Sequence, residues 1–165
     1  MRARTQNPIT FRYCNLTEQD ATYGNYKLTA EFPRESFAGL VEAVEAWLPG
    51  WLESPKCKLS AAEAALFKKV DVATLLMKAN QDPENPDVVL VDFKSKPDTD
   101  GTRRFGLTDA DGDTWNDKER INHGTVGLME YNINPGVHTG KPYIGRYLNK
   151  VMVTENGSGG EVAAF

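Results

Sequence analysis

The sequence predicts a single α+β domain that is mainly β, with a helical segment between the early and the late strands. Two observations carry this prediction. Apolar and polar residues alternate in segments near both ends of the chain, which is the period of a β-strand. The segment between them instead repeats apolar residues at helical spacing. Strands, then helices, then more strands are typical of the α+β class with an antiparallel sheet.

Two strands are expected first, at 9–14 and 23–32. A helix is expected next, because apolar residues recur three and four positions apart from Phe37 to Leu48. Pro49, which is followed by glycine, predicts the end of this helix.

A second helical piece is predicted to begin at Ser60 and to continue toward Phe67, because Ser60 and Glu63 form a capping box. The serine hydroxyl accepts from the first turn, and the glutamate reaches back to the backbone of the serine. Residues 71–79 fit either a continued helix or an extended link, and the sequence leaves both open.

Four later strands are expected, at 88–96, 103–108, 124–133 and 143–155, with turns at 97–101, 110–113 and 134–136. Strands of this number and length can close an antiparallel barrel of the OB type, which commonly binds oligonucleotides. Residues 1–155 are therefore predicted to form one domain. The Gly-rich residues 156–165 are predicted to be a flexible tail.

The composition is ordinary for a globular protein, with 40% hydrophobic and 25% charged residues among 165. No apolar run approaches the ~18 residues that would indicate a membrane span. The start of the chain lacks the apolar core of a secretory signal, so an intracellular location is expected. Cys14 and Cys57 form no metal or redox spacing and are expected to be reduced thiols.

The net charge of −4 argues against a uniformly basic nucleic-acid-binding domain. The charges are segregated along the chain, however. No acidic residue occurs between Tyr131 and Thr154, a stretch that holds Lys141, Arg146 and Lys150. Such a pattern permits a local cationic groove on an acidic protein.

The strand at 143–155 carries the clearest functional signal. Its alternation places Ile144, Leu148 and Met152 toward a core, on the same side as Arg146 and Lys150, and places Tyr143, Tyr147 and Asn149 on the other face. Aromatic rings beside cations on a sheet suit single-stranded nucleic acid, because bases stack on the rings and cations bind the phosphates. Each residue alone is ordinary packing or surface, and only the recurrence over several strands favours a binding surface.

An enzyme is not expected. The Asp-rich segment 109–117 resembles the opening of a calcium loop, but Thr114 stands where the turn requires glycine and Arg120 where a bidentate acid is required. A β-hairpin turn on Asp111-Gly112 explains the same residues. No catalytic residue, metal site or cofactor is therefore predicted. A metal-dependent nuclease that uses these acids stays as a weaker alternative.

The order of three segments resembles a known family: 26–30, then 105–113 with its Asp-Gly hairpin, then 124–135 leading into 148–155. This arrangement is similar to the single-stranded-DNA-binding proteins of short-tailed bacteriophages, which are OB-fold replication proteins. The resemblance implies a protein that coats single-stranded DNA during phage replication and recombination in the host cytoplasm. It also implies possible homodimers and a C-terminal tail, here ending in Phe165, that contacts the replicative polymerase or other replication proteins.

The resemblance also implies which residues line the DNA-binding groove: Lys94, Lys96, Arg103, Phe105, Tyr131, Arg146, Tyr147 and Lys150. The predicted function is thus sequence-tolerant binding of single-stranded DNA by base stacking and phosphate contacts, without catalysis. The alternative is a β-rich protein-interaction or carbohydrate-binding module, in which the same tyrosines would stack on sugars or on side chains of a partner.

Overall fold

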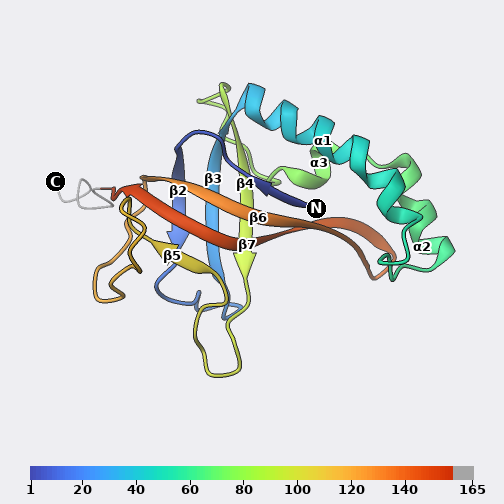
Figure 1. Ribbon diagram of the computed structural model, residues 1–165. Helices are drawn as coiled ribbons and strands as arrows, with labels where there is room; N and C mark the ends of the chain where they lie inside the picture. Colours follow the sequence, from blue (N-terminus) through green and yellow to red (C-terminus); the bar gives the residue numbers. More distant parts are fainter. Residues whose placement is uncertain (158–165) are drawn as a thin grey trace.

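The computed structural model describes residues 1–157, which are mainly β with helices between the early and the late strands, as predicted (Figure 1). The strands are β1 (Arg2–Arg4), β2 (Ile9–Asn15), β3 (Tyr26–Pro33), β4 (Val88–Ser95), β5 (Gly106–Thr108), β6 (Thr125–His138) and β7 (Lys141–Glu155). The helices are α1 (Arg34–Leu52), α2 (Ala61–Ala65), the short 3₁₀ helix η1 (Leu66–Lys69) and α3 (Val72–Leu76). Within residues 1–157 no helix has both the length and the apolar character needed to cross a bilayer.

The strands form one sheet in the order β1-β6-β2-β3-β4-β7-β5, and β6 also pairs with β7. The pairings therefore lead from β2 through β3, β4, β7 and β6 back to β2. Within this five-stranded ring all pairs are antiparallel except β4 and β7, which meet in parallel at Lys94 and Tyr147. Figure 1 shows the long strands β6 and β7 crossing over β2, β3 and β4.

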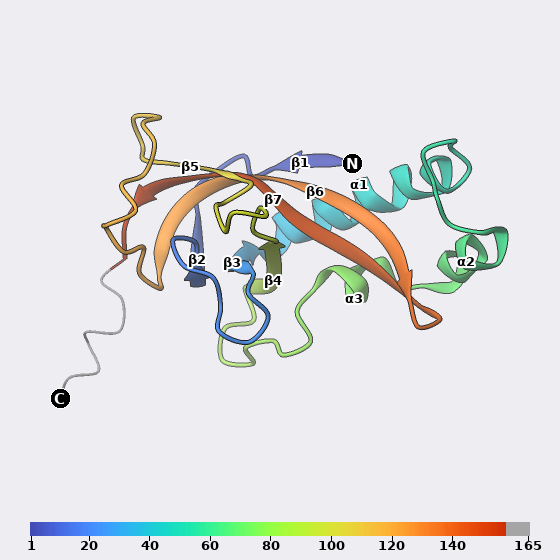
Figure 2. The ribbon, with the colours of Figure 1, turned by 90° about the horizontal axis from the view of Figure 1, so that it is seen from below.

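Beyond the ring, β6 and β7 continue as a two-stranded hairpin that reaches toward α2 (Figure 2). We call residues 134–145 the hairpin arm. The turn predicted at 134–136 is wrong, because the β6–β7 pairing runs unbroken to His138 and Lys141. The chain reverses instead at Thr139 and Gly140, whose φ values of 49° and 76° fit a two-residue hairpin turn. Pro135 is tolerated because this part of β6 pairs on one side only.

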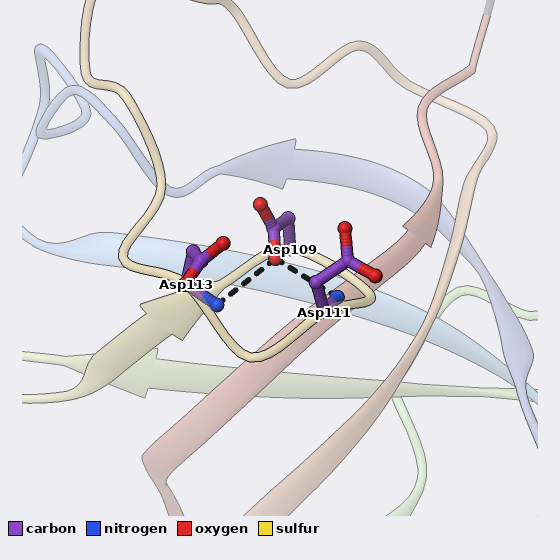
Figure 3. A group of neighbouring side chains, drawn as sticks. All are labelled: Asp109, Asp111 and Asp113. Atoms are coloured by element: carbon purple, nitrogen blue, oxygen red, sulfur yellow. Dashed lines mark hydrogen bonds between the residues drawn. The ribbon is translucent and has the colours of Figure 1, made fainter.

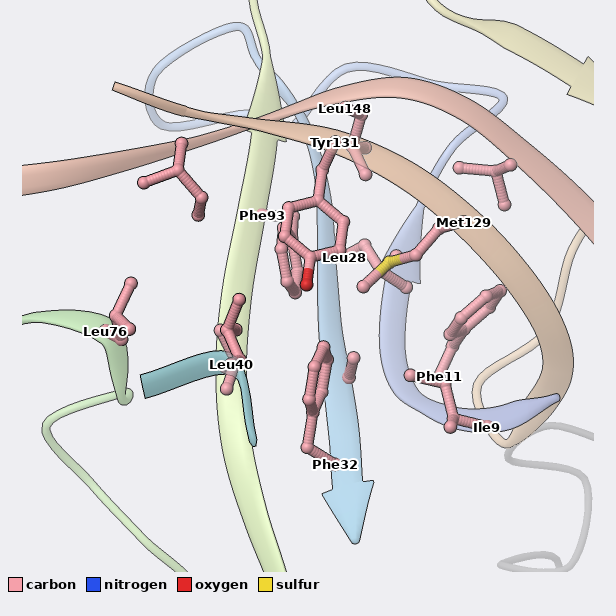
Figure 4. Packing of buried hydrophobic residues seen from close by; sticks show 14 of the residues in the cluster. Ile9, Phe11, Leu28, Phe32, Leu40, Leu76, Phe93, Met129, Tyr131 and Leu148 are labelled. Carbon is pink, nitrogen blue, oxygen red and sulfur yellow. The ribbon is translucent and has the colours of Figure 1, made fainter. Parts of the chain in front are cut away.

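Side chains from the inner faces of the ring strands and from α1 and α3, together with some from η1, β5 and the loops, form the core (Figure 4). The rings of Phe32 and Phe93 stack with centroids 5.9 Å apart, and the ring of Tyr131 lies 4.7 Å from Phe93. Leaving water stabilises each such buried side chain by roughly 1.5–3 kcal/mol, so this face of each strand is fixed inward. The opposite faces are left for solvent or ligand.

The helix α1 continues through Pro49 to Leu52, so the end predicted at Pro49 is wrong. A proline this close to the C-terminus removes only one helical hydrogen bond. The last turn is held by the buried side chain of Leu48 and by the contact of Trp47 with Trp51, whose ring centroids are 5.6 Å apart.

The capping box at the start of α2 is confirmed. Ser60 Oγ accepts from the backbone N–H of Glu63 at 3.1 Å, and Glu63 Oε1 accepts from the N–H of Ser60 at 3.0 Å. The segment 71–79, left open by the sequence, contains the five residues of α3.

The described chain extends slightly past the predicted domain end at residue 155. Asn156 Oδ1 accepts hydrogen bonds from the backbone N–H of Asn122 and from the hydroxyl of Thr125, both at 3.0 Å. Residues 158–165, including Phe165 of the predicted partner-binding tail, lie outside the described residues.

Candidate nucleic-acid interface

A β-bulge in β7 determines which side chains face outward. Leu148 pairs with Tyr131 but Lys150 pairs with Glu130, so Asn149 is an extra residue. The alternation shifts by one at this point, and Val151 rather than Lys150 turns into the core. The predicted core position of Met152 is therefore wrong, and Lys150, which alternation alone places on the core side, turns outward. After the bulge, Lys150 faces outward as Tyr147 does before it.

A groove of about 640 Å³ lies between the strands β2–β4 and the hairpin arm. Four large hydrophobic or aromatic side chains are exposed in residues 1–157, and three of them line this groove: Tyr13 (52% exposed), Tyr23 (75%) and Tyr143 (42%). Tyr147 is half-buried in the same lining. We call this site the tyrosine groove. Its four rings offer flat apolar faces to a ligand.

The tyrosine groove is also cationic. Its lining contains Lys27, Lys78, Lys94 and Arg146 but a single carboxylate, that of Asp92. Lys78 Nζ lies 3.0 Å from an Asp92 oxygen, and the Lys27 ammonium is paired with Asp20 just outside the lining at 3.2 Å. Although the whole chain carries a net charge of −4, this concavity concentrates positive charge.

Lys94 and Tyr147 form the junction between the ring and the arm. They are register partners in the parallel β4–β7 contact, and Lys94 Nζ lies 5.9 Å from the centroid of the Tyr147 ring. Burial raises the pKa of the Tyr147 phenol, and the neighbouring Tyr143 raises this pKa further. A cation and an aromatic ring therefore stand together in the lining of the groove.

Arg146 anchors the arm rather than projecting into solvent. Its Nε donates to the carbonyl of Asp92 at 2.7 Å, and its Nη1 donates to the carbonyls of Leu75 at 2.7 Å and Ile144 at 3.0 Å. Burial lowers the pKa of this guanidinium, and the charge of Asp92 opposes that effect. Arg146 thus ties β7 to β4 and α3, and it is one of the residues that line the groove.

Three other predicted residues lie away from the groove lining. Lys96 follows the end of β4 and is exposed. Arg103 and Phe105 precede the three-residue strand β5, so the strand predicted at 103–108 begins only at Gly106. Phe105 is 4% exposed and packs edge-on against Tyr26 at 5.6 Å, while Arg103 Nη1 pairs with Asp117 at 2.5 Å.

Tyr131 and Lys150 are also outside the groove. Tyr131 is 2% exposed, and burial raises the pKa of its phenol. Its ring belongs to the core and has no free face for a base. Lys150 is exposed beside Arg4 and Met152 in a separate hollow of about 300 Å³. Of the eight predicted residues, the groove brings together Lys94, Arg146 and Tyr147.

The sequence interpretation missed Tyr13, Tyr23 and Lys27 as groove residues and did not include Tyr143 among them. Alternation from Phe11 places Tyr13 in the core, but a bulge between Phe11 and Tyr13 turns the tyrosine outward. The strand predicted at 23–32 begins only at Tyr26, so Tyr23 lies in the loop before β3, outside the strand alternation. The signal that could have identified Tyr143 is its shared strand face with Tyr147.

The Asp-rich segment forms a hairpin turn, as predicted (Figure 3). Asp109 Oδ1 accepts from the backbone N–H groups of Asp111 at 2.9 Å and Asp113 at 3.0 Å, and Gly112 has a φ of 86°. Carboxylate oxygens of the three aspartates lie within 4.8 Å of one another. Because asparagine and aspartate side chains commonly make such bonds in turns, the turn itself explains why these residues are present.

A larger cavity, about 890 Å³, lies between β1 and α1. Its aromatic lining consists of Phe32 and Tyr131, which are both buried in the core. The charge of Arg2 at its edge is paired with Glu130 at 3.2 Å. This cavity offers no open ring, so the tyrosine groove is the better candidate for binding bases.

Comparison with solved structures relates this architecture to known proteins. No protein-family model and no curated protein matches the sequence. The single-stranded DNA-binding protein from bacteriophage Enc34, in a C-terminally truncated form, superimposes with a TM-score of 0.67 at 13% identity, over 97% of this chain and 87% of that one. The chain has the fold of phage single-stranded-DNA-binding proteins.

Two further structures support this fold assignment. The Enc34 protein in complex with single-stranded DNA gives a TM-score of 0.65 at 11% identity, over 96% of this chain and 89% of that one. The single-stranded DNA-binding protein gp2.5 of bacteriophage T7 gives 0.64 at 17% identity, over 98% and 91%. The similarity therefore spans nearly the whole of each phage protein rather than a shared fragment.

Proposed function

We propose that this protein binds single-stranded DNA without sequence preference during phage DNA replication or recombination, and that it does so as a binding protein rather than an enzyme. The observation that carries the proposal is the tyrosine groove, in which exposed rings and cations gather in one concavity. The similarity in fold to two phage single-stranded DNA-binding proteins gives independent support.

In the proposed binding mode the aromatic rings contact the bases and the cations contact the phosphates. Bases stack on the tyrosines, and each stacked base contributes about 1–3 kcal/mol. Lys27, Lys78 and Lys94 contact phosphates and release counterions, which makes binding weaken as salt rises. Two or three stacked bases with these contacts are enough for micromolar affinity, which corresponds to about 8 kcal/mol.

We further propose that the five-stranded ring is a barrel of the OB type. The ring of pairings from β2 through β3, β4, β7 and β6 supports this assignment. OB-type barrels bind oligonucleotides mainly on the face of their second and third strands and on the adjoining loops. In this chain the second and third strands of the ring are β3 and β4, which contribute Lys27 and Lys94 to the groove.

A carbohydrate or protein ligand would also use exposed tyrosines, and this remains the alternative. The positive lining favours a polyanion over a neutral sugar. Contacts of the C-terminal segment ending in Phe165 with replication proteins, and self-association, remain predictions from the family resemblance.

Fluorescence titration tests the proposal. An oligo-dT is added to the protein at low salt, tyrosine and tryptophan emission is followed, and the titration is repeated at rising salt. We expect saturable quenching whose affinity falls with salt, weaker binding of a duplex of the same length, and an intact oligonucleotide afterwards. The absence of binding at low salt would contradict the proposal, as would metal-dependent degradation of the oligonucleotide.

A further inference from the structure

The phenol end of the Tyr147 ring lies against Gly145. A Cβ atom at Gly145 would lie 2.5 Å from Cε2 of Tyr147, 2.6 Å from its hydroxyl oxygen and 2.7 Å from Cζ. Carbon atoms in contact prefer separations of about 3.5–4.0 Å, so any side chain at position 145 would displace the ring. The two residues share a face of β7 because they are two positions apart.

Gly136 and Tyr143 repeat the same arrangement on the other half of the arm. They are direct register partners of β6 and β7. The nearest atoms to a Cβ at Gly136 would again be the phenol end of a tyrosine, here the hydroxyl oxygen, Cζ and Cε1 of Tyr143. Both glycines are buried although they lie in a two-stranded arm, because the rings cover them.

Neither glycine is required by the backbone. Neither has a φ in the left-handed region, unlike Gly140 in the turn of the same arm. Glycine inside a strand weakens the strand, and it commonly marks a place where another group approaches the backbone closely. In the arm that group is a tyrosine ring of the proposed binding site in both cases.

We propose that Gly145 and Gly136 are positioning residues for base stacking, which allow the rings of Tyr147 and Tyr143 to lie back along the arm. This inference rests on the proposed function. The phenol end of each ring lies against the backbone at its glycine, so the glycine determines how far the ring can lean over the arm. The rings are therefore held in place before DNA arrives, which reduces the ordering cost of binding.

The test is a double-mutant cycle with Gly145→Ala, Tyr147→Ala and the combined variant, each titrated with oligo-dT. Gly145→Ala adds only a methyl group and removes no stacking or charged group, yet it should weaken binding by roughly 5- to 100-fold, as the loss of one stacked base would. In the Tyr147→Ala background the same glycine substitution should have no further effect on affinity, because it acts through the ring.

Gly50→Ala is the matched control, since a Cβ at this position in α1 meets no atom within 4 Å. This variant should bind like the wild type. If Gly145→Ala proves too unstable to titrate, the combined variant, in which the clash is relieved, should regain the melting temperature of Tyr147→Ala. Failure to regain it would overturn the inference.

The outcomes separate the two proposals. If Tyr147→Ala itself binds as tightly as the wild type, base stacking on this ring fails and the inference fails with it. If Tyr147→Ala weakens binding but Gly145→Ala does not, the proposed function stands and the positioning role is overturned. Equal losses from Gly145→Ala in both backgrounds would also overturn it, because a general structural effect would explain them.

Discussion

Lys94 and Tyr147 meet at the one residue pair where β4 and β7 run in parallel, with Lys94 Nζ 5.9 Å from the centre of the tyrosine ring. C-terminal to this junction, β7 belongs to the five-stranded ring and contributes residues to the core. N-terminal to the junction, β7 leaves β4 and forms a wall of the tyrosine groove. Arg146 fastens this wall to the carbonyl of Asp92 on β4.

Replacing Lys94 by alanine should weaken single-strand binding and reduce its salt dependence. One lost phosphate contact lowers the slope of log K against log salt concentration by about 0.7 for a single strand. The affinity of the variant and the wild type for oligo-dT is measured over a series of salt concentrations. Lys118→Ala, which removes an exposed lysine outside the groove lining, is the matched control and should keep the wild-type slope. An unchanged slope for Lys94→Ala would show that Lys94 does not contact a DNA phosphate.

Tyr131 and Tyr23 should respond in opposite ways to substitution. Tyr131→Ala removes a ring from the core, where comparable losses cost about 3–5 kcal/mol, so its urea midpoint should fall sharply. Tyr23→Ala removes a ring that is 75% exposed and should leave the midpoint nearly unchanged while weakening oligo-dT binding. A stable Tyr131→Ala variant with weakened binding would restore Tyr131 to the binding site.

Arg146→Met should destabilise the arm, because three backbone carbonyls lose a charged donor. Hydrogen bonds to charged groups contribute about 1.5–3 kcal/mol each at most, and unpaired buried carbonyls add a cost. Faster amide hydrogen exchange is expected in residues 141–147, together with weaker DNA binding. Arg146→Lys should rescue little, since an ammonium lacks the planar fork that reaches several carbonyls. Full rescue by lysine would show that charge alone matters.

The folded protein should lose stability at alkaline pH because the thiol of Cys14 is buried. Burial raises the pKa of its thiol from 9.0 to about 11, so the folded state disfavours the thiolate. This contribution is fully present below pH 9 and is lost as the pH rises toward 11, with a slope of at most about 1.4 kcal/mol per pH unit. Chemical denaturation between pH 8 and 11 should show a shallower decline for Cys14→Ser than for the wild type. Parallel declines would contradict the buried, neutral thiol.

The periodicity of apolar residues predicted most of the strands and helices, because each face of such an element lies mainly either against the core or in solvent. The strands at 9–14 and 88–96 and the Ser60 capping box follow from local patterns alone. The extension of β6 through Pro135 does not follow from a local pattern, because a strand tolerates a proline only where one of its edges has no partner strand. That condition depends on tertiary structure.

The candidate site was less predictable than the fold for a specific physical reason. Two β-bulges, at Arg12 and Asn149, each exchange the inner and outer faces of a strand. Strict alternation assigns Tyr13 and Lys150 to the core, and the structure turns both outward. Tyr131 shows the opposite error: it is predicted to line the DNA-binding groove, whereas its ring packs on Phe93 in the core. A sequence pattern does not reveal where an extra residue enters a strand.

Photocross-linking can show whether bound single-stranded DNA lies in the tyrosine groove. An oligo-dT that carries iododeoxyuridine at several positions is bound at low salt and irradiated, and the linked residues are identified by mass spectrometry. The structure predicts cross-links to Tyr13, Tyr23, Tyr143 or Tyr147 that disappear when salt releases the DNA. Cross-links confined to the surface around Phe105 and Lys150, with none in the groove, would show that the DNA binds elsewhere on the protein.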